Sequence, residues 1–146
     1  KCIQNIGNSF GGINLEDIKA PECFEIEKRL VEELDIPVMH DDQHGTAIIS
    51  GAALINGLEL VDKEISNVKV VISGAGASAI SCARHYVRLG VKKDNIIMVD
   101  STGILTESRM KNGDLNKYKE EFARSLSDGG LSDAMLESDV FLGLSK

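Results

Sequence analysis

Six consecutive small residues form the clearest candidate for a ligand-binding turn in this chain. They fit a G-x-G-x-x-A pattern and are Gly74, Ala75, Gly76, Ala77, Ser78 and Ala79. Where such a run follows a strand and opens a helix, the first glycine permits a tight turn and the second lets the backbone approach a pyrophosphate. The small third position lets helix and strand pack, and the free N–H groups of the helix start face the phosphates. The pattern therefore predicts that residues 74–79 bind a dinucleotide.

A carboxylate stands where such a ligand would place its adenosine ribose. Asp100 ends the next predicted strand, slightly beyond the ~20 residues that usually separate the turn from the ribose-binding acid. A carboxylate there accepts a hydrogen bond from a 2′-hydroxyl and repels a 2′-phosphate, which favours NAD. Ser101, Thr102 and Arg109 lie close in sequence and offer donors to a phosphate, so NADP stays open.

Two pairs of adjacent acids are candidates for a metal site. Glu16-Asp17 and Asp41-Asp42 each fall where a predicted element meets a loop. Mg²⁺ prefers carboxylate oxygens and keeps waters that a substrate can displace. The alternative is that the pairs are solvated charges or helix caps, since the chain has 23 acidic residues and pairs arise by chance. His40 and His44 flank the second pair, but without a third ligand at zinc spacing they are interpreted as polar residues that orient their neighbours.

The elements needed to position these residues alternate between apolar strands and helices. Apolar runs at 68–72, 96–99 and 140–142 are typical of short buried strands. Helices are expected over 46–60 and over 77–89, the second ending at Gly90. This alternation predicts an α/β fold with a Rossmann-type doubly wound parallel sheet.

A different pattern precedes residue 45 and another follows residue 101. Residues 1–12 are expected to form a strand or loop, a helix to begin at Pro21, and a short strand to cover 36–39. Turn-rich sequence follows over 102–113. Polar helices are then expected over 115–125 and 132–136. We expect a domain boundary that divides the chain into 1–44 and 45–146.

Charge and composition exclude several classes of protein. The chain has 146 residues and a net charge of −7, so it has no electrostatic reason to bind nucleic acid or an anionic membrane. No apolar run approaches the ~20 residues that span a bilayer. The three cysteines lack zinc or redox spacing, which indicates reduced thiols and a cytoplasmic location. Because the chain starts at Lys1 without a methionine or signal peptide, we expect an internal part of a longer protein.

Four segments together resemble the bacterial-type malic enzymes. They extend over essentially the whole chain and cover residues 10–27, 36–48, 71–80 and 139–145. The two acidic motifs make the resemblance specific to this family, because the glycine turn is shared with many dehydrogenases. The resemblance implies that residues 1–44 end the family's N-terminal domain and that residues 45–146 form an incomplete NAD(P)-binding domain. It also implies oxidative decarboxylation of malate to pyruvate and CO₂ with NAD or NADP.

The resemblance also implies roles for particular residues. A divalent metal, Mg²⁺ or Mn²⁺, would be held by Glu16, Asp17 and Asp42, with Asp41 as a supporting acid of the catalytic site. Such a metal polarises the malate hydroxyl and the ketone that replaces it. The family's catalytic lysine and tyrosine are expected upstream of Lys1, so the chain alone is expected to be inactive. The parent protein is expected to form a homodimer or a larger assembly.

Two other functions remain open at this point. The chain could be a non-catalytic dinucleotide-binding module whose acidic pairs are structural, or part of another Rossmann dehydrogenase. Those dehydrogenases need no metal at the substrate hydroxyl. The motifs around Glu16-Asp17 and Asp41-Asp42 are therefore the features that separate a malic enzyme from both alternatives.

Overall fold

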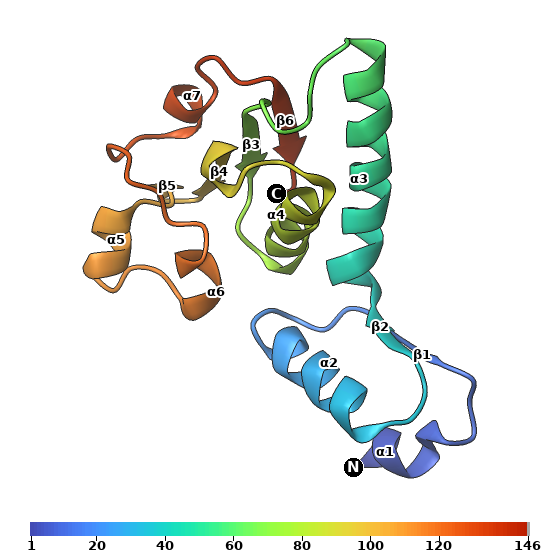
Figure 1. Ribbon diagram of the computed structural model, residues 1–146. Coiled ribbons are helices and arrows are strands. Elements are labelled where there is room, and N and C mark those ends of the chain that lie inside the picture. Colours follow the sequence, from blue (N-terminus) through green and yellow to red (C-terminus); the bar gives the residue numbers. More distant parts are fainter. Residues whose placement is uncertain (146) are drawn as a thin grey trace.

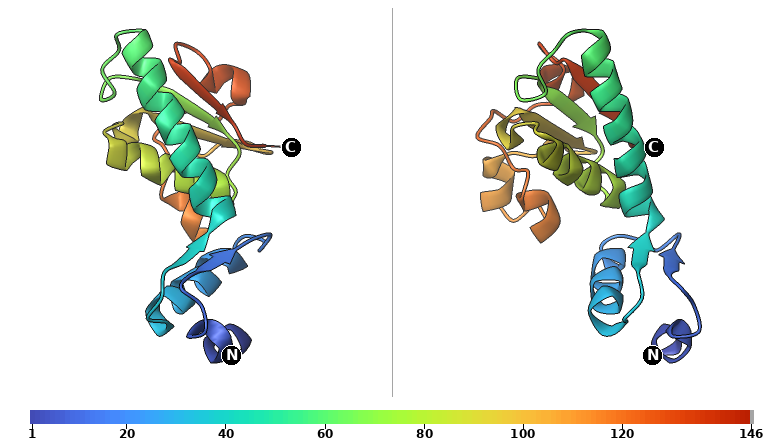
Figure 2. Two further views of the ribbon diagram at one scale, coloured as in Figure 1. Left: turned by 90° about the vertical axis from the view of Figure 1, so that its right-hand side faces the viewer. Right: turned by 45° about the vertical axis from the view of Figure 1, so that its right-hand side comes forward.

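The computed structural model describes residues 1–145, which form a small N-terminal segment and a larger sheet domain; the segment leads into the start of a long helix that packs beside the sheet (Figure 1). The N-terminal segment contains α1 (Cys2–Gly7), β1 (Ile13–Leu15), α2 (Glu22–Glu33) and β2 (Val38–His40). Strands β1 and β2 pair in parallel, with Leu15 opposite His40. Figure 2 shows this segment set apart from the sheet, at the start of α3.

The helix α1 contradicts the expectation of a strand or loop for residues 2–7, while residues 8–12 form the expected loop. It is short and has contacts with the end of α2: Gly7 is buried close to the Leu34 side chain, and the Gln4 amide donates to Glu33. Such contacts leave no periodic signal in six residues. Helix α2, by contrast, is confirmed next to Pro21, and it buries Cys23, Phe24 and Leu30.

The long helix α3 (Asp41–Leu60) begins five residues earlier than the predicted 46–60 helix. Its first turn therefore contains Asp41 and Asp42, whose negative charges suit the positive end of a helix. Gly45 makes room for the Asp41 side chain, since a Cβ at Gly45 would collide with Asp41 Oδ1. The second acidic pair thus belongs to a helix and not to a loop.

Four strands form the main sheet in the order β5-β4-β3-β6. Strand β3 (Val70–Ser73) pairs in parallel with β4 (Ile96–Asp100) on one side and with β6 (Val140–Gly143) on the other. The short strand β5 (Gly103–Ile104) is antiparallel to β4, so the sheet is mixed. The predicted α/β fold of Rossmann type is confirmed, and the chain crosses from one side of β3 to the other between β4 and β6.

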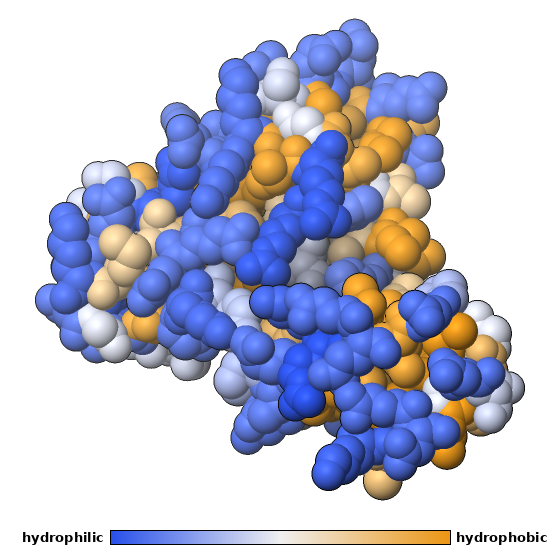
Figure 3. Space-filling view, turned by 60° about the horizontal axis from the view of Figure 1, so that its bottom comes forward, coloured by the Kyte–Doolittle hydropathy of each residue, from blue (hydrophilic) through white to orange (hydrophobic). Residues whose placement is uncertain are grey.

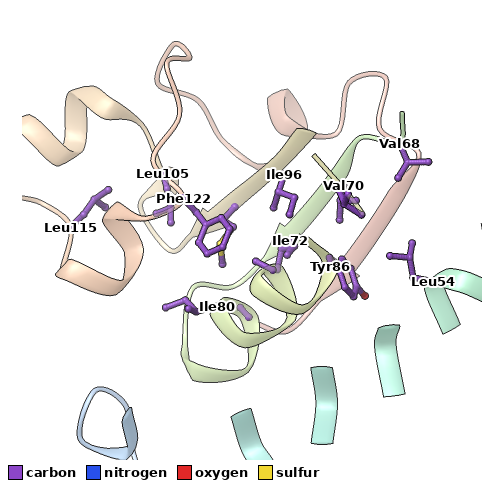
Figure 4. Packing of buried hydrophobic residues seen from close by; sticks show 14 of the residues in the cluster. Leu54, Val68, Val70, Ile72, Ile80, Tyr86, Ile96, Leu105, Leu115 and Phe122 are labelled. Atoms are coloured by element: carbon purple, nitrogen blue, oxygen red, sulfur yellow. The ribbon is translucent and has the colours of Figure 1, made fainter. Parts of the chain in front are cut away.

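Helices cover both faces of this sheet. Helix α4 (Ala77–Leu89) packs on one face, where Ile72, Ile80 and Tyr86 lie in the main core (Figure 4). It ends as predicted at Gly90, whose φ is +119°. Helix α3 crosses α4 so closely that a Cβ at Gly51 would approach the His85 ring to 2.7 Å. On the other face, a smaller apolar cluster contains Ala134 from α7 (Leu131–Ala134).

The region after β5 is more irregular than predicted. It contains α5 (Glu107–Lys111) and α6 (Lys117–Glu120). A one-turn 3₁₀ helix (Lys93–Asn95) lies earlier in the chain, just before β4. The helix predicted over 115–125 is shorter in the structure. The backbone at Arg124 does not continue the helix but pairs with the segment at Thr106 as an isolated β-bridge. The Arg124 N–H donates to the Leu105 carbonyl, and the Glu107 N–H donates to the Arg124 carbonyl. Among residues 1–145, no helix combines the length and apolar character needed to cross a membrane.

Candidate functional site

The turn between β3 and α4 has the geometry that its glycines predict. Gly74 has a φ of +126°, and a Cβ there would lie 3.1 Å from the Leu144 backbone. Its N–H donates to the Val99 carbonyl at 2.7 Å, which ties the turn to the neighbouring strand. The first glycine is therefore required by the fold itself, because L side chains rarely adopt this conformation.

The second and third positions of the pattern have different surroundings. A Cβ at Gly76 would meet nothing within 4 Å, so the backbone there faces open space. Ala79 is almost completely buried against the core, as expected for the position where helix and strand pack. Open space at Gly76 beside the start of α4 fits a pyrophosphate, which needs close access to backbone N–H groups.

The turn lies at the carboxyl end of β3, between its two neighbouring strands. Leu144, just after β6, donates its N–H to the Ser73 carbonyl at 2.8 Å, and the hydroxyls of Ser73 and Ser145 lie 2.9 Å apart. In open α/β sheets, ligands bind where successive connections leave opposite sides of one strand. The structure places residues 74–79 at such a position.

Asp100 lies at the carboxyl end of β4, but its carboxylate already has three donors. Arg109 Nη1 and Nη2 donate to its two oxygens at 3.0 and 3.1 Å, and Lys119 Nζ donates at 2.7 Å. The Thr102 N–H adds a fourth hydrogen bond at 3.0 Å. Burial alone raises the pKa of Asp100, but the hydrogen bonds from Arg109 and Lys119 outweigh it and lower the pKa to about 2. Asp100 is therefore ionised and neutralised by two cations.

This arrangement changes the roles expected near Asp100. The predicted role of Arg109 as a phosphate donor conflicts with its contacts, because its Nη1 also donates to the carbonyls of Gly103 and Ile104. Its side chain is only 10% exposed, so it acts as a clamp inside the fold. Lys119 was missed by the sequence analysis. It belongs to α6, and no local pattern relates that helix to the end of β4.

The two acidic pairs meet at one end of the small sheet. Parallel pairing of β1 and β2 brings Asp17 next to Asp42, whose Oδ2 accepts a hydrogen bond from the Asp17 N–H at 2.9 Å. Asp17 itself has a φ of +56°. Glu16 instead accepts a hydrogen bond from the Asn14 amide at 2.9 Å. The structure therefore joins Asp17 with Asp42, while Glu16 is bonded to its own strand.

These carboxylates fit a hard divalent cation in chemistry and in backbone placement, because each pair comes directly after one of two paired strands and supplies oxygen ligands. The ligand group itself is not assembled. Within residues 1–145, no group of three or more His, Cys, Asp or Glu side chains is arranged to hold a metal ion. Glu16 and Asp17 are exposed, and Glu16 is bonded to Asn14 and not directed to Asp42.

Glu27 organises the residues around the second acidic pair and was also missed by the sequence analysis. From α2, its carboxylate accepts hydrogen bonds from the His40 N–H at 2.9 Å and from the Gln43 amide at 3.2 Å. The His44 ring lies 2.8 Å from the same carboxylate. These contacts fix the start of α3, and they give His44 the orienting role expected of it.

His40 is the buried member of this group. Its side chain is fully buried, and its Nε2 lies 3.2 Å from Asp42 Oδ2. That contact has ion-pair distance without hydrogen-bond geometry, so both ring nitrogens lack a hydrogen-bond partner in the part of the chain that the structure describes. A buried imidazole beside Asp42 limits where that carboxylate can turn.

One hydrogen bond connects the glycine turn to the acidic residues. The Ser78 hydroxyl, in the first turn of α4, donates to the main-chain carbonyl of Asp42 at 2.5 Å. Ser78 was expected only to contact a dinucleotide. The contact brings the two motifs, which are far apart in sequence, into one site.

The sheet order, the glycine turn and its place at the carboxyl end of β3, between two neighbouring strands, define a Rossmann-type dinucleotide-binding domain. A sequence model of the family described as "Malic enzyme, NAD binding domain" matches residues 43–140. The chain therefore belongs to the malic enzyme family.

Individual relatives agree with this assignment. The chain is 52% identical over 140 residues to the NADP-dependent malic enzyme of Escherichia coli, and 51% identical over 137 residues to a NAD-dependent malic enzyme of Rhizobium meliloti. Each match covers 94% of this chain but 18% of the relative. The NADP-dependent malic enzyme of Halomonas elongata is 48% identical over 98% of this chain and 33% of its own length. The chain thus spans about a fifth to a third of these relatives.

The fold agrees with a solved structure of the same family. The crystal structure of a NAD-dependent malic enzyme from Thermotoga maritima superposes with a TM-score of 0.90 and 43% sequence identity. The match covers 99% of this chain and 39% of that one. The family supports binding of NAD or NADP, and the relatives include enzymes named for each.

Proposed function

We propose that this chain is part of an enzyme that oxidises malate with NAD or NADP and decarboxylates the product to pyruvate and CO₂. The observation that carries the proposal is the combination of the family match with the open turn at Gly76, beside the paired acids. Residues 1–44 would complete a preceding domain, and residues 45–146 would begin the NAD(P)-binding domain. Malate and pyruvate are the proposed small-molecule partners.

The dinucleotide would lie along the glycine turn. Residues 74–79 would receive the pyrophosphate at the start of α4, and Asp100 would lie beside the adenosine ribose. Asp100 alone favours NAD. Because Arg109 and Lys119 neutralise its charge, the carboxylate no longer repels a 2′-phosphate, and Lys119 offers a donor for one. Coenzyme choice would therefore depend on Lys119 as much as on Asp100.

A divalent cation, Mg²⁺ or Mn²⁺, would be held by Glu16, Asp17 and Asp42. When bound, such a cation polarises the hydroxyl and ketone oxygens of the substrate. Asp42 would be the fixed ligand, because three neighbours restrain it: the Asp17 N–H, the His40 ring and the Ser78 hydroxyl. Asp41 folds back over Gly45 and would support the start of α3.

The decisive test is the substitution Asp42→Ala in the intact protein that contains this chain. We expect malate-dependent reduction of NAD(P) in the presence of Mn²⁺ to fall by at least ~10³-fold, since the variant loses the carboxylate that binds the metal and accepts the Asp17 N–H. Nucleotide binding should persist, because the glycine turn is unchanged. Glu32→Ala, an exposed acid on α2, is the matched control and should keep wild-type turnover.

The same assay separates the alternatives. A non-catalytic module would show no malate-dependent turnover in the wild type, and another Rossmann dehydrogenase would turn over without a divalent cation. Near-normal, metal-dependent activity in Asp42→Ala would reject the proposed ligands.

We also propose that the intact protein is a cytoplasmic homodimer or larger assembly. Its net charge of −7 over this chain gives no reason to expect nucleic-acid or membrane binding.

A further inference from the structure

The hydrogen bond between Ser78 and Asp42 links two segments to which the proposed function assigns different ligands. Ser78 is the second residue of α4 and lies in the proposed dinucleotide turn. Asp42 is the second residue of α3 and is a proposed metal ligand. The serine Oγ donates to the Asp42 carbonyl at 2.5 Å, and both residues are partly buried. The contact therefore joins the first turns of two helices.

Asp42 is also restrained through its side chain. Its Oδ2 accepts the Asp17 N–H at 2.9 Å and lies 3.2 Å from the His40 ring. Glu27 fixes the same turn from the other side through the His40 N–H. Because the Ser78 hydroxyl bonds to the Asp42 carbonyl, a displacement of the first turn of α4 would act on the backbone that carries this carboxylate.

We propose that Ser78 is a positioning residue that couples nucleotide binding at the glycine turn to cation binding at Asp42. A nucleotide that orders the start of α4 would hold the Asp42 carbonyl in place and so preorganise the Asp42 carboxylate. By thermodynamic linkage, a bound cation tightens nucleotide binding by the same factor. The proposal rests on the proposed function, since it needs both ligands to bind at these residues.

A purely local role for Ser78 predicts a different result. If the hydroxyl served only as a nucleotide contact, its removal would weaken nucleotide binding equally with and without a cation. If it served only the fold, its removal would lower stability and leave the linkage intact. The informative quantity is therefore the coupling factor, which is the Mn²⁺ dissociation constant without nucleotide divided by that with nucleotide.

The experiment uses the intact protein that contains this chain. Free Mn²⁺ is measured by electron paramagnetic resonance, with and without saturating NAD or NADP, whichever the wild type binds more tightly. We expect a coupling factor above one in the wild type and a loss of about fivefold in Ser78→Ala, the size of one ordinary hydrogen bond. Ser78→Thr keeps the hydroxyl and should keep the coupling. Ser81→Ala removes a buried serine one turn later on α4 and should also keep it.

A second measurement on the wild type does not depend on any variant folding. Nucleotide added without a cation should slow amide hydrogen exchange in peptides that cover residues 38–46. An unchanged coupling factor in Ser78→Ala, a wild-type factor of one, or no protection of residues 38–46 would each overturn the coupling. A wild type that binds neither Mn²⁺ nor nucleotide would overturn the proposed function, and the coupling with it.

Discussion

Asp100 and Asp42 both lie near the carboxyl end of a parallel strand, but their surroundings are very different. Asp100 is the last residue of β4 and is clamped by Arg109 and Lys119, so its charge is neutralised inside the fold. Asp42 is the second residue of α3, and its neighbours are the Asp17 N–H group, the buried His40 ring and the Ser78 hydroxyl. The first carboxylate is committed to protein cations. Within the described residues, no Lys or Arg side chain pairs with the second carboxylate, which leaves its charge available to a metal cation.

Lys119 is where coenzyme choice can be tested at the scale of one residue. We expect Lys119→Gln in the intact protein to lower kcat/KM for NADP by roughly 10- to 100-fold, because a charge-assisted hydrogen bond to the 2′-phosphate is lost. The value for NAD should change by less than about threefold, since its 2′-hydroxyl needs no cation. Steady-state kinetics with both coenzymes measure this ratio.

The control for this experiment lies on the same helix. Lys117 is exposed and bonded to Glu25 on α2, away from Asp100, so Lys117→Gln should leave the ratio unchanged. Equal losses for NAD and NADP in Lys119→Gln would show that the lysine supports only the Asp100 clamp.

At the scale of elements, the connection between β3 and α4 serves two separate purposes. Gly74 is required by the turn, because its φ is positive and the Leu144 backbone crowds its missing Cβ. Gly76 is not required by the turn, because its φ is −88° and open space surrounds it. The fold therefore requires the first glycine but not the second, where we propose that the pyrophosphate binds.

The two glycines therefore give a matched pair of substitutions. We expect Gly74→Ala to destabilise the protein by about 1–3 kcal/mol through backbone strain. Gly76→Ala should cost at most about 1 kcal/mol, the scale of a helix N-cap change. It should nevertheless weaken NAD(P) binding at least ~10-fold, because the methyl group occupies the space for the pyrophosphate.

Thermal unfolding of the ligand-free proteins and calorimetric titration of the nucleotide measure the two effects separately. A Gly76→Ala variant that binds nucleotide normally would remove the pyrophosphate from this turn. A Gly74→Ala variant as stable as the wild type would contradict the strain argued from its backbone.

At the scale of the whole molecule, the chain leaves apolar surface uncovered. Large side chains on α3 are exposed, among them Ile49 at 74% and Leu60 at 87%. Phe141 on β6 is 49% exposed. Figure 3 shows apolar atoms gathered in several areas of one face, among a mostly hydrophilic surface. Apolar patches of this kind are typical of surfaces that contact other protein. The relatives contain about three to five times the length of this chain, so their further residues would supply such contacts.

The last prediction concerns residues 1–146 expressed alone. We expect no malate-dependent reduction of NAD(P) with Mn²⁺, because Glu16 and Asp17 are exposed and their ligand group is not assembled. The family's lysine and tyrosine are also expected outside this chain, and each acid–base group contributes about 10²–10⁴-fold. The assay compares this chain with the intact protein at equal concentration. Robust turnover by the chain alone would place the catalytic groups within residues 1–146.

The sequence by itself determined the elements whose signals are local. The β-branched runs of β3 and β4, the helix between Ala77 and Leu89 and the glycine at its end were predicted to within two residues. The acids and the glycine turn were also identifiable, because their chemistry depends on residue type and spacing. Propensity and periodicity act over a few residues, so these features are visible without a fold.

Only the tertiary structure decided how these residues are connected. The clamp of Lys119 on Asp100, the support of the acidic turn by Glu27 and the bond from Ser78 to Asp42 all join segments far apart in sequence. The early start of α3 and the existence of α1 likewise depend on contacts with other elements. Such contacts form because chain folding brings distant donors and acceptors together, and no pattern within one segment records which partner each of them will meet.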